Sequence, residues 1–248
     1  MKVFLDIGGH EGQTLLSVLD PKYAFDKIYV FEPVKSLHEK LDIQAAGRQN
    51  VTLLQFGLWN KNAQQKIYSP GTLAGSIFSG HTDIDEAKFE LCEFVTASEW
   101  FAQNIYSDDE VYAKLNCEGA EADILLDLLQ SKEIFKIKNV AIDFDVRKVK
   151  GLENAQEQVL NSFEKQNFTA YSLCEDAMRG PTHLVRVQSW LDAVGARKPG
   201  FGNRLAQSVY WLRTAVSGKR PGYSWELKHA IKSLTPLILL KLTGARRS

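Results

Sequence analysis

The regular alternation of two residue patterns over residues 1–166 constrains the fold of this chain more than any other feature. Short apolar runs that predict strands alternate with segments whose apolar residues recur at helical spacing. Such an alternation supplies the crossover that each parallel strand pair requires, and it predicts a mainly parallel sheet with helices on both faces. The expected strands are 2–7, 27–31, 51–56, 111–116 and 138–144, and the expected helices are 12–20, 35–46, 98–104, 119–130 and 152–166.

Two further strand-like runs, at residues 168–173 and 182–187, follow the last expected helix. Only a loop without a helical pattern separates them. Because a parallel pair needs a crossover of about a dozen residues or more, these two runs pair more easily as antiparallel neighbours. The sequence therefore predicts an antiparallel last strand.

Residues 57–97 contain little periodic pattern beyond a short strand near 64–68. A long polar loop inside a compact domain is usually functional or disordered. Two interpretations follow: the segment closes over an acceptor substrate, or it is a mobile connection.

Charge divides the chain into two parts, although its formal net charge is zero. Residues 197–248 hold eleven Lys or Arg and one acid, Glu226, so residues 1–196 carry a net charge of −10. We expect a main domain over residues 1–190 and a basic, amphipathic helical tail over residues 191–248. Basic residues beside Trp, Tyr and Leu are typical of a helix at the surface of an anionic membrane. The alternative is that the apolar stripes pack on the main domain or on a second subunit, forming a homo-oligomer.

Cysteine usage and hydropathy indicate a cytoplasmic protein, or one held peripherally on the inner face of a membrane. Cys92, Cys117 and Cys174 are widely spaced and form no CxxC pair, which suggests neither a disulfide framework nor a zinc site. No run approaches the roughly 20 apolar residues of a membrane-spanning helix, and no basic or apolar leader precedes the first strand.

A glycine-rich segment follows the first expected strand, and an acidic residue follows the second. Gly8, Gly9 and Gly12 would let the backbone turn tightly and approach a ligand, and Glu32 could accept hydrogen bonds from both ribose hydroxyls. This indicates a nucleotide-binding edge. The dinucleotide fingerprint is Gly-x-Gly-x-x-Gly, whose middle spacing is absent here, so this segment fits a dinucleotide and S-adenosylmethionine (SAM) equally well.

A second motif favours SAM. The string Lys114-Leu-Asn116-Cys-Glu118-Gly-Ala-Glu121 lies between an expected strand and an expected helix. It is not typical of nicotinamide-dependent enzymes at this place.

Together, residues 5–12, 31–33 and 114–121 resemble the motifs of the FkbM-type SAM-dependent methyltransferases. The resemblance covers about residues 1–187, and Asn116 stands where the family usually has Asp. It implies a Rossmann-like class I methyltransferase fold, with a mainly parallel seven-stranded sheet and an antiparallel last strand. It also implies O-methylation in polysaccharide, glycolipid or secondary-metabolite biosynthesis, so a sugar hydroxyl is the expected acceptor.

The resemblance and the strand ends assign residues to the expected cofactor. The segment from Asp6 to Gly12 would hold the methionine part of SAM, and Glu32 with Pro33 would hold the ribose. Two residues at the end of the third strand are expected to border the adenine by position alone. The complete expected cofactor set is Asp6, Gly8, Gly9, His10, Gly12, Glu32, Pro33, Gln55, Phe56 and Asn116.

Methyl transfer to a hydroxyl requires alignment and a base or hydrogen-bond acceptor for the hydroxyl proton. Glu118 is the expected base or acceptor-orienting carboxylate, with Asn116 and Lys114 nearby. Imidazole titrates near neutrality, so His81 in the long polar segment is a second candidate base.

A divalent metal is a weaker prediction. Asp143 and Asp145 alternate with apolar residues, so their side chains should share one face and could bind Mg²⁺ or Ca²⁺ together with Glu118. The neutral Asn116 makes this less favourable, and the same carboxylates could instead bind sugar hydroxyls.

Two rival functions fit parts of the sequence. An NAD(P)-dependent oxidoreductase would use Glu32 equally well, and a non-catalytic SAM- or glycan-binding partner of a glycan-synthesis complex would explain Asn116. No nucleic acid is expected, because the chain contains no recognisable nucleic-acid-reading motif.

Overall fold

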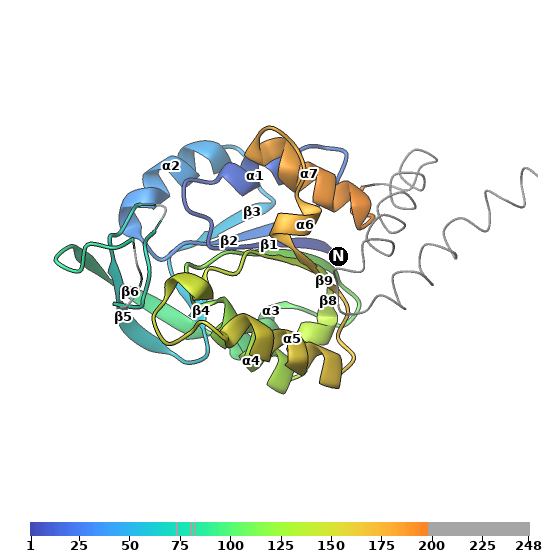
Figure 1. Cartoon of the computed structure of the whole chain (residues 1–248). Coiled ribbons are helices and arrows are strands. Elements are labelled where there is room, and N and C mark those ends of the chain that lie inside the picture. Colours follow the sequence, from blue (N-terminus) through green and yellow to red (C-terminus); the bar gives the residue numbers. More distant parts are fainter. Residues whose placement is uncertain (73, 80, 82, 198–248) are drawn as a thin grey trace, which may run out of the picture.

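Six parallel strands form the central sheet of the computed structural model, which describes residues 1–72, 74–79, 81 and 83–197. The strand order is β3-β2-β1-β7-β8-β9, and every neighbouring pair is parallel (Figure 1). The direction of chain progression reverses between β1 and β7, which is where open α/β sheets bind ligands. The bounds are β1 Lys2–Ile7, β2 Lys27–Phe31, β3 Val51–Leu54, β7 Glu110–Leu115, β8 Ile137–Ile142 and β9 Tyr171–Leu173.

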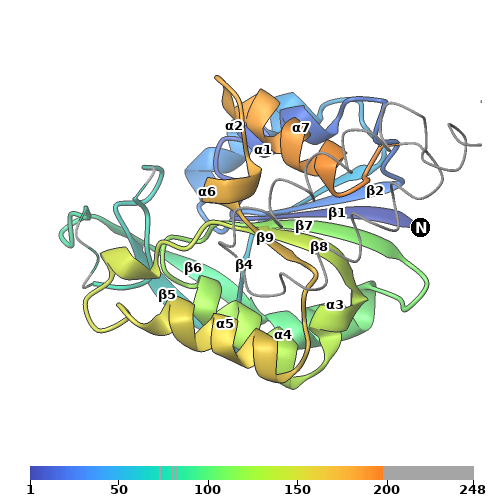
Figure 2. The same ribbon diagram turned by 45° about the vertical axis from the view of Figure 1, so that its right-hand side comes forward.

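Helices cover both faces of this sheet, which confirms the expected α/β, Rossmann-like architecture (Figures 1 and 2). One face packs against α1 (Gln13–Val18), α2 (Lys35–Ala45), α6 (Cys174–Ala177) and α7 (His183–Ala193). The other packs against α3 (Ala97–Asn104), α4 (Glu121–Gln130) and α5 (Ala155–Lys165). Two short 3₁₀ helices, Glu133–Lys136 and Val146–Lys148, flank β8.

A second sheet of three strands lies within the long polar segment that the sequence indicated at residues 57–97. Its order is β4-β6-β5, with bounds β4 Gly57–Trp59, β5 Ala63–Tyr68 and β6 Phe89–Thr96. The expected strand at 64–68 is confirmed within β5. The sequence did not predict strand β6. Its outward positions include the exposed but apolar Leu91, so apolar and polar residues do not alternate clearly around buried Cys92 and Phe94.

The predicted antiparallel last strand is wrong, because residues 183–193 form helix α7. Thr182 caps the helix, its side chain accepting a hydrogen bond from the N–H of Val185. Val187, Trp190 and Leu191 are buried at helical spacing, whereas Val185 is 41% exposed. The β-branched residues favour a strand locally, but the cap and the burial of one helical face outweigh that preference. In the part of the chain that the structure describes, the main sheet therefore has six parallel strands rather than seven.

Helix α7 is fixed to the sheet by a buried hydrogen-bond network. The indole N–H of Trp190 donates to Asn139 Oδ1 at 2.8 Å, and the hydroxyl of Ser172 donates to the same oxygen at 3.0 Å. The packing continues beyond residue 190, since Ala196 is also buried.

The expected boundary between residues 190 and 191 lies inside α7, and most of the predicted tail lies outside the described residues. Its membrane or subunit contacts stay predictions. Among the residues that the structure describes, no helix is both long enough and apolar enough to cross a membrane.

The helical assignment of residues 183–193 is testable with two neighbouring valines. In a strand, Val185 and Val187 would point to the same face, whereas in α7 only Val187 is buried. We expect Val187→Asp to lower the free energy of unfolding by roughly 3–5 kcal/mol, because it buries an unpaired charge. Val185→Asp should change it by about 0.5 kcal/mol or less. Urea unfolding of both variants measures the difference, and equal losses would contradict the helix.

Candidate functional site

The turn after β1 joins the carboxyl ends of three strands. The N–H groups of Gly8 and Gly9 both donate to the carbonyl of Phe31, at 3.1 and 2.9 Å, and the N–H of Asn116 donates to the carbonyl of Ile7 at 3.0 Å. Gly8 has φ +89°, and a Cβ there would lie 1.9 Å from the carbonyl oxygen of Asn116. Glycine is therefore required at this position by the protein's own packing.

The other two glycines of the turn have similar internal reasons. A Cβ on Gly9 would lie 2.3 Å from Val30 Cγ1, and one on Gly12 would lie 2.3 Å from Gln44 Oε1. The glycine pattern in the sequence predicted close approach of a ligand. Contacts within the protein already account for it, so the functional evidence has to come from the cavities beside the turn.

Glu32 follows β2 and is held in place by backbone groups. Its Oε2 accepts a hydrogen bond from the N–H of His10 at 2.8 Å, and its Oε1 accepts one from the N–H of Val34 at 2.9 Å. The side chain is buried, and this burial raises the pKa of Glu32 to about 7. Each carboxylate oxygen retains acceptor capacity for a further donor, such as a ligand hydroxyl.

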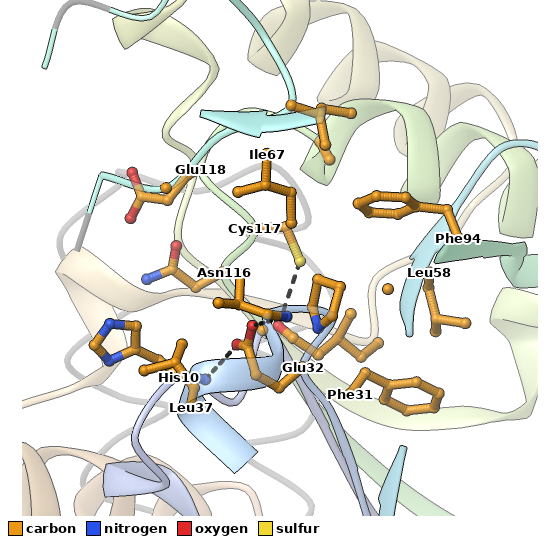
Figure 3. Close-up of a pocket in the computed structure, with 18 of the residues that line it drawn as sticks. His10, Phe31, Glu32, Leu37, Leu58, Ile67, Phe94, Asn116, Cys117 and Glu118 are labelled. Atoms are coloured by element: carbon orange, nitrogen blue, oxygen red, sulfur yellow. Dashed lines mark hydrogen bonds between the residues drawn. The ribbon is translucent and has the colours of Figure 1, made fainter. Parts of the chain in front are cut away.

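A first cavity, of about 800 Å³ including its open mouth, lies between this edge of the main sheet and the small sheet. Figure 3 shows that its two ends differ, with Glu32 between them. Phe31, Leu58 and Phe94 form an apolar end, and His10, Asn116 and Glu118 form a polar end. Its wall also includes Pro33, Leu37, Ile67, Gly71, Thr72, Ile77 and Cys117.

A second cavity, of about 1230 Å³ including its open mouth, lies beside the first at the same sheet edge. Its wall is mainly polar and includes Lys114, Asp143, Arg147, His183 and Arg186. The two cavities have a shared boundary made of Gly8, His10 and Asn116.

Glu118 lies in a charged cluster at the polar end of the first cavity. Its Oε2 is 3.3 Å from Lys148 Nζ and 3.5 Å from His81 Nε2, and Lys148 Nζ is 2.8 Å from Asp145 Oδ1. Burial raises the pKa of Glu118, the Asp145 carboxylate raises it further, and the Lys148 ammonium opposes both. Glu118, His81 and Asp145 were expected at a site from the sequence, whereas Lys148, one helical turn after Asp145, was not.

His81 supports Glu118 rather than competing with it for a proton. Its buried ring accepts a hydrogen bond at Nδ1 from the N–H of Asp83 at 3.2 Å, so the neutral ring carries its proton on Nε2, which faces Glu118. Burial lowers the pKa of His81, and Lys148 lowers it further. The neutral ring therefore faces the carboxylate of Glu118 with Nε2, at 3.5 Å from Oε2, without forming a hydrogen bond to it.

Glu121, the last residue of the second motif, shapes the loop before α4. Its fully buried carboxylate accepts hydrogen bonds from the N–H of Cys117 at 2.6 Å and of Gly119 at 3.0 Å. Burial raises the pKa of Glu121 to about 7. It lines neither cavity, which assigns it a structural role in holding Glu118 at the wall.

Asp6 and Lys114 lie on the opposite side of the sheet edge from Glu118. They are register partners on β1 and β7, and Lys114 lines the second cavity. Asp6 is fully buried, and burial raises its pKa to about 6 even though the Lys114 charge lowers it. Lys114 and Glu118, which were expected to lie near each other, line different cavities: of these two, the first contains only Glu118 and the second only Lys114.

The three expected metal ligands do not assemble. Strand β8 ends at Ile142, so the strand alternation that should place Asp143 and Asp145 together does not continue through them. Asp143 lines the second cavity, whereas Asp145 contacts Lys148 beside Glu118. In the described part of the chain, no group of three or more His, Cys, Asp or Glu residues is arranged to hold a metal ion.

Gln55 and Phe56, the expected adenine neighbours, do not line the first cavity. Gln55 is exposed, and the Phe56 ring packs on that of Phe31 with centroids 6.0 Å apart. Leu58 and Phe94 of the small sheet instead contribute to the apolar end of this cavity. No local pattern identifies Phe94, because exposed Leu91 hides the alternation of β6.

The burial of Glu121 predicts a pH-dependent stability. Its folded pKa of about 7 exceeds the ordinary 4.5, so its contribution to the free energy of unfolding is present below pH 4.5 and is lost as the pH rises to about 7. We expect Glu121→Gln to flatten this decline by on the order of 2 kcal/mol. Urea unfolding at pH 4.5 and 7.5 measures the decline in the free energy of unfolding, and Glu164→Gln, at an exposed position, is the control. The same decline in both variants would count against this role.

Comparison with known proteins gives one structural likeness. No protein-family model matches the chain, and no curated protein sequence matches it. Among solved structures, it is similar to the crystal structure of methyltransferase FkbM from Methylobacillus flagellatus KT, with 15% sequence identity and a TM-score of 0.42. The match covers 64% of this chain and 37% of that one, so the chain spans well under half the length of this neighbour.

Proposed function

We propose that this protein is a SAM-dependent methyltransferase that transfers a methyl group to a hydroxyl oxygen of a sugar-containing acceptor. The observation that carries the proposal is the first cavity, in which the buried Glu32 carboxylate separates an apolar end from a polar end. Adenosine has the matching chemistry, with an aromatic base beside a ribose diol. The resemblance of residues 5–12, 31–33 and 114–121 to the FkbM-type motifs supports the same cofactor.

The residues present fit SAM at each part of the first cavity. Phe31, Leu58 and Phe94 would hold the adenine, and Glu32 would accept hydrogen bonds from the ribose hydroxyls. Asn116 Oδ1 is buried and has no hydrogen-bond partner among the described residues, which leaves it available to a donor on the ligand. Bound SAM supplies an electrophilic methyl group on a sulfonium centre.

Glu118 is the proposed acceptor of the hydroxyl proton. Its raised pKa brings it closer to neutrality, which favours proton transfer from a weakly acidic hydroxyl. His81 and Lys148 fix the orientation of the carboxylate, because both face the same oxygen, Oε2. The second cavity, which adjoins the first at His10 and Asn116, is the proposed entrance for the acceptor.

The cofactor assignment is tested by thermal unfolding with S-adenosylhomocysteine, SAM, NAD and NADP in parallel. We expect the two SAM-related ligands alone to stabilise the protein, since a ligand at 100 times its dissociation constant adds about 2.7 kcal/mol. Glu32→Gln should weaken S-adenosylhomocysteine binding roughly 10- to 100-fold, because it removes a charged hydrogen-bond acceptor.

The exposed Glu39→Gln on α2 is the matched control and should bind normally. Stabilisation by NAD or NADP instead would overturn the proposal in favour of an oxidoreductase.

The role of Glu118 is tested by turnover, using an acceptor found by transfer of radiolabelled methyl groups to a glycan panel. We expect Glu118→Gln to lower kcat about 10²- to 10⁴-fold while S-adenosylhomocysteine affinity changes little. The active form is the carboxylate and its pKa is raised, so wild-type kcat should fall as the pH drops below neutrality. Glu153→Gln changes an exposed carboxylate that lines neither cavity, and it should keep wild-type kcat. Unimpaired turnover in Glu118→Gln would remove this residue from the mechanism, and no turnover with any acceptor would favour a non-catalytic binding role.

A further inference from the structure

A buried lysine, Lys114, lines the second cavity. Lys114 is only 5% exposed, and its ammonium forms no hydrogen bond or ion pair with the described residues. Its register partner Asp6 is likewise fully buried, and the two charges attract each other, although no ion pair joins them. Burying an unpaired charge is costly, and the cost is offset when an opposite charge binds.

Further cations surround the mouth of this cavity. The exposed guanidinium of Arg186 forms no hydrogen bond or ion pair within the described region. Arg147 lies 3.8 Å from Glu175, and both side chains are more than half exposed, so water screens this pair. A ligand anion can therefore engage the arginines at little cost.

The remaining wall groups suit hydroxyl groups. Asp143 lines the cavity and offers carboxylate acceptors. His183 contacts Thr14 Oγ1 at 3.1 Å, and burial lowers its pKa to about 4, so it is neutral near pH 7. The cavity wall thus combines the buried ammonium of Lys114 with neutral and acidic polar groups.

We propose that the second cavity binds an acceptor sugar that carries an anionic group, a carboxylate or a phosphate, and that Lys114 is its main counter-charge. This inference rests on the proposed function, which places the nucleoside in the first cavity. Asp143 accepts hydrogen bonds from the sugar hydroxyls, and Arg186 contacts the anion from the solvent side. The shared boundary at Gly8, His10 and Asn116 then lies between the acceptor and the first cavity.

The experiment is a binding titration on the full chain saturated with S-adenosylhomocysteine, using glucuronic acid, glucose 6-phosphate and glucose as probes. Thermal unfolding reports each dissociation constant. We expect at least one anionic sugar to bind at least tenfold more tightly than glucose, and the stronger of the two identifies the anion as carboxylate or phosphate. Lys114→Met should remove this preference for the anionic sugar.

Two further variants complete the design. Arg186→Gln changes an exposed residue, so it tests the same cavity if Lys114→Met fails to fold, and it should weaken anionic-sugar binding several-fold. Lys138→Met removes an exposed lysine of β8 that lines neither cavity, and it should bind all three sugars like the wild type.

Three outcomes would overturn the inference. The first is equal binding of glucose and both anionic sugars, including no binding of any. The second is a preference for the anionic sugar that survives both Lys114→Met and Arg186→Gln. The third is weaker S-adenosylhomocysteine binding in Lys114→Met, which would assign Lys114 to the cofactor's own carboxylate. In all three the protein still binds S-adenosylhomocysteine. Failure to bind S-adenosylhomocysteine at all would instead contradict the proposed function.

Discussion

The close approach of the Gly8 backbone to the Asn116 carbonyl is the contact on which the rest of the site depends. It brings the ends of β1 and β7 together at the point where the sheet's connections reverse direction. The first cavity lies toward β2 and the small sheet, and the second toward β8 and α7. A side chain at residue 8 would separate these strand ends, and the two cavities would lose the boundary that they share.

The buried carboxylates at this edge have different hydrogen-bond partners. This difference distinguishes carboxylates with a structural role from those that can bind a ligand. Glu121 accepts two backbone N–H groups and holds a loop. Glu32 also accepts two, but it lies in a cavity wall with acceptor capacity left over. Asp6 is fully buried beside Lys114, whose charge attracts it, and neither of its oxygens forms a hydrogen bond that holds a loop. The groups with unused capacity are those that a ligand can satisfy.

Local signals predicted most of the architecture, but they failed where tertiary packing prevailed. The strands at β1, β2, β7 and β8 followed from apolar runs, because a strand buried on both faces reads as continuous hydrophobic sequence. Residues 182–187 were wrongly predicted as a strand because Val185 and Val187 favour strands locally. The burial of Trp190 against Asn139 instead stabilises a helix. The small sheet was missed because exposed Leu91 hid the alternation of β6.

Sequence alone determined the parallel sheet, the glycine turn, the acid after β2 and the Lys114–Glu121 string, because each depends on residues close together in the chain. Only the tertiary structure decided which of these residues share a cavity. Alternation along β7 sends Lys114 to one side of the sheet, and the loop after it, with Glu118 at φ +47°, turns that carboxylate to the other. Leu58, Phe94, His81 and Lys148 come from segments far apart in sequence, so their roles depend on packing that no local pattern records.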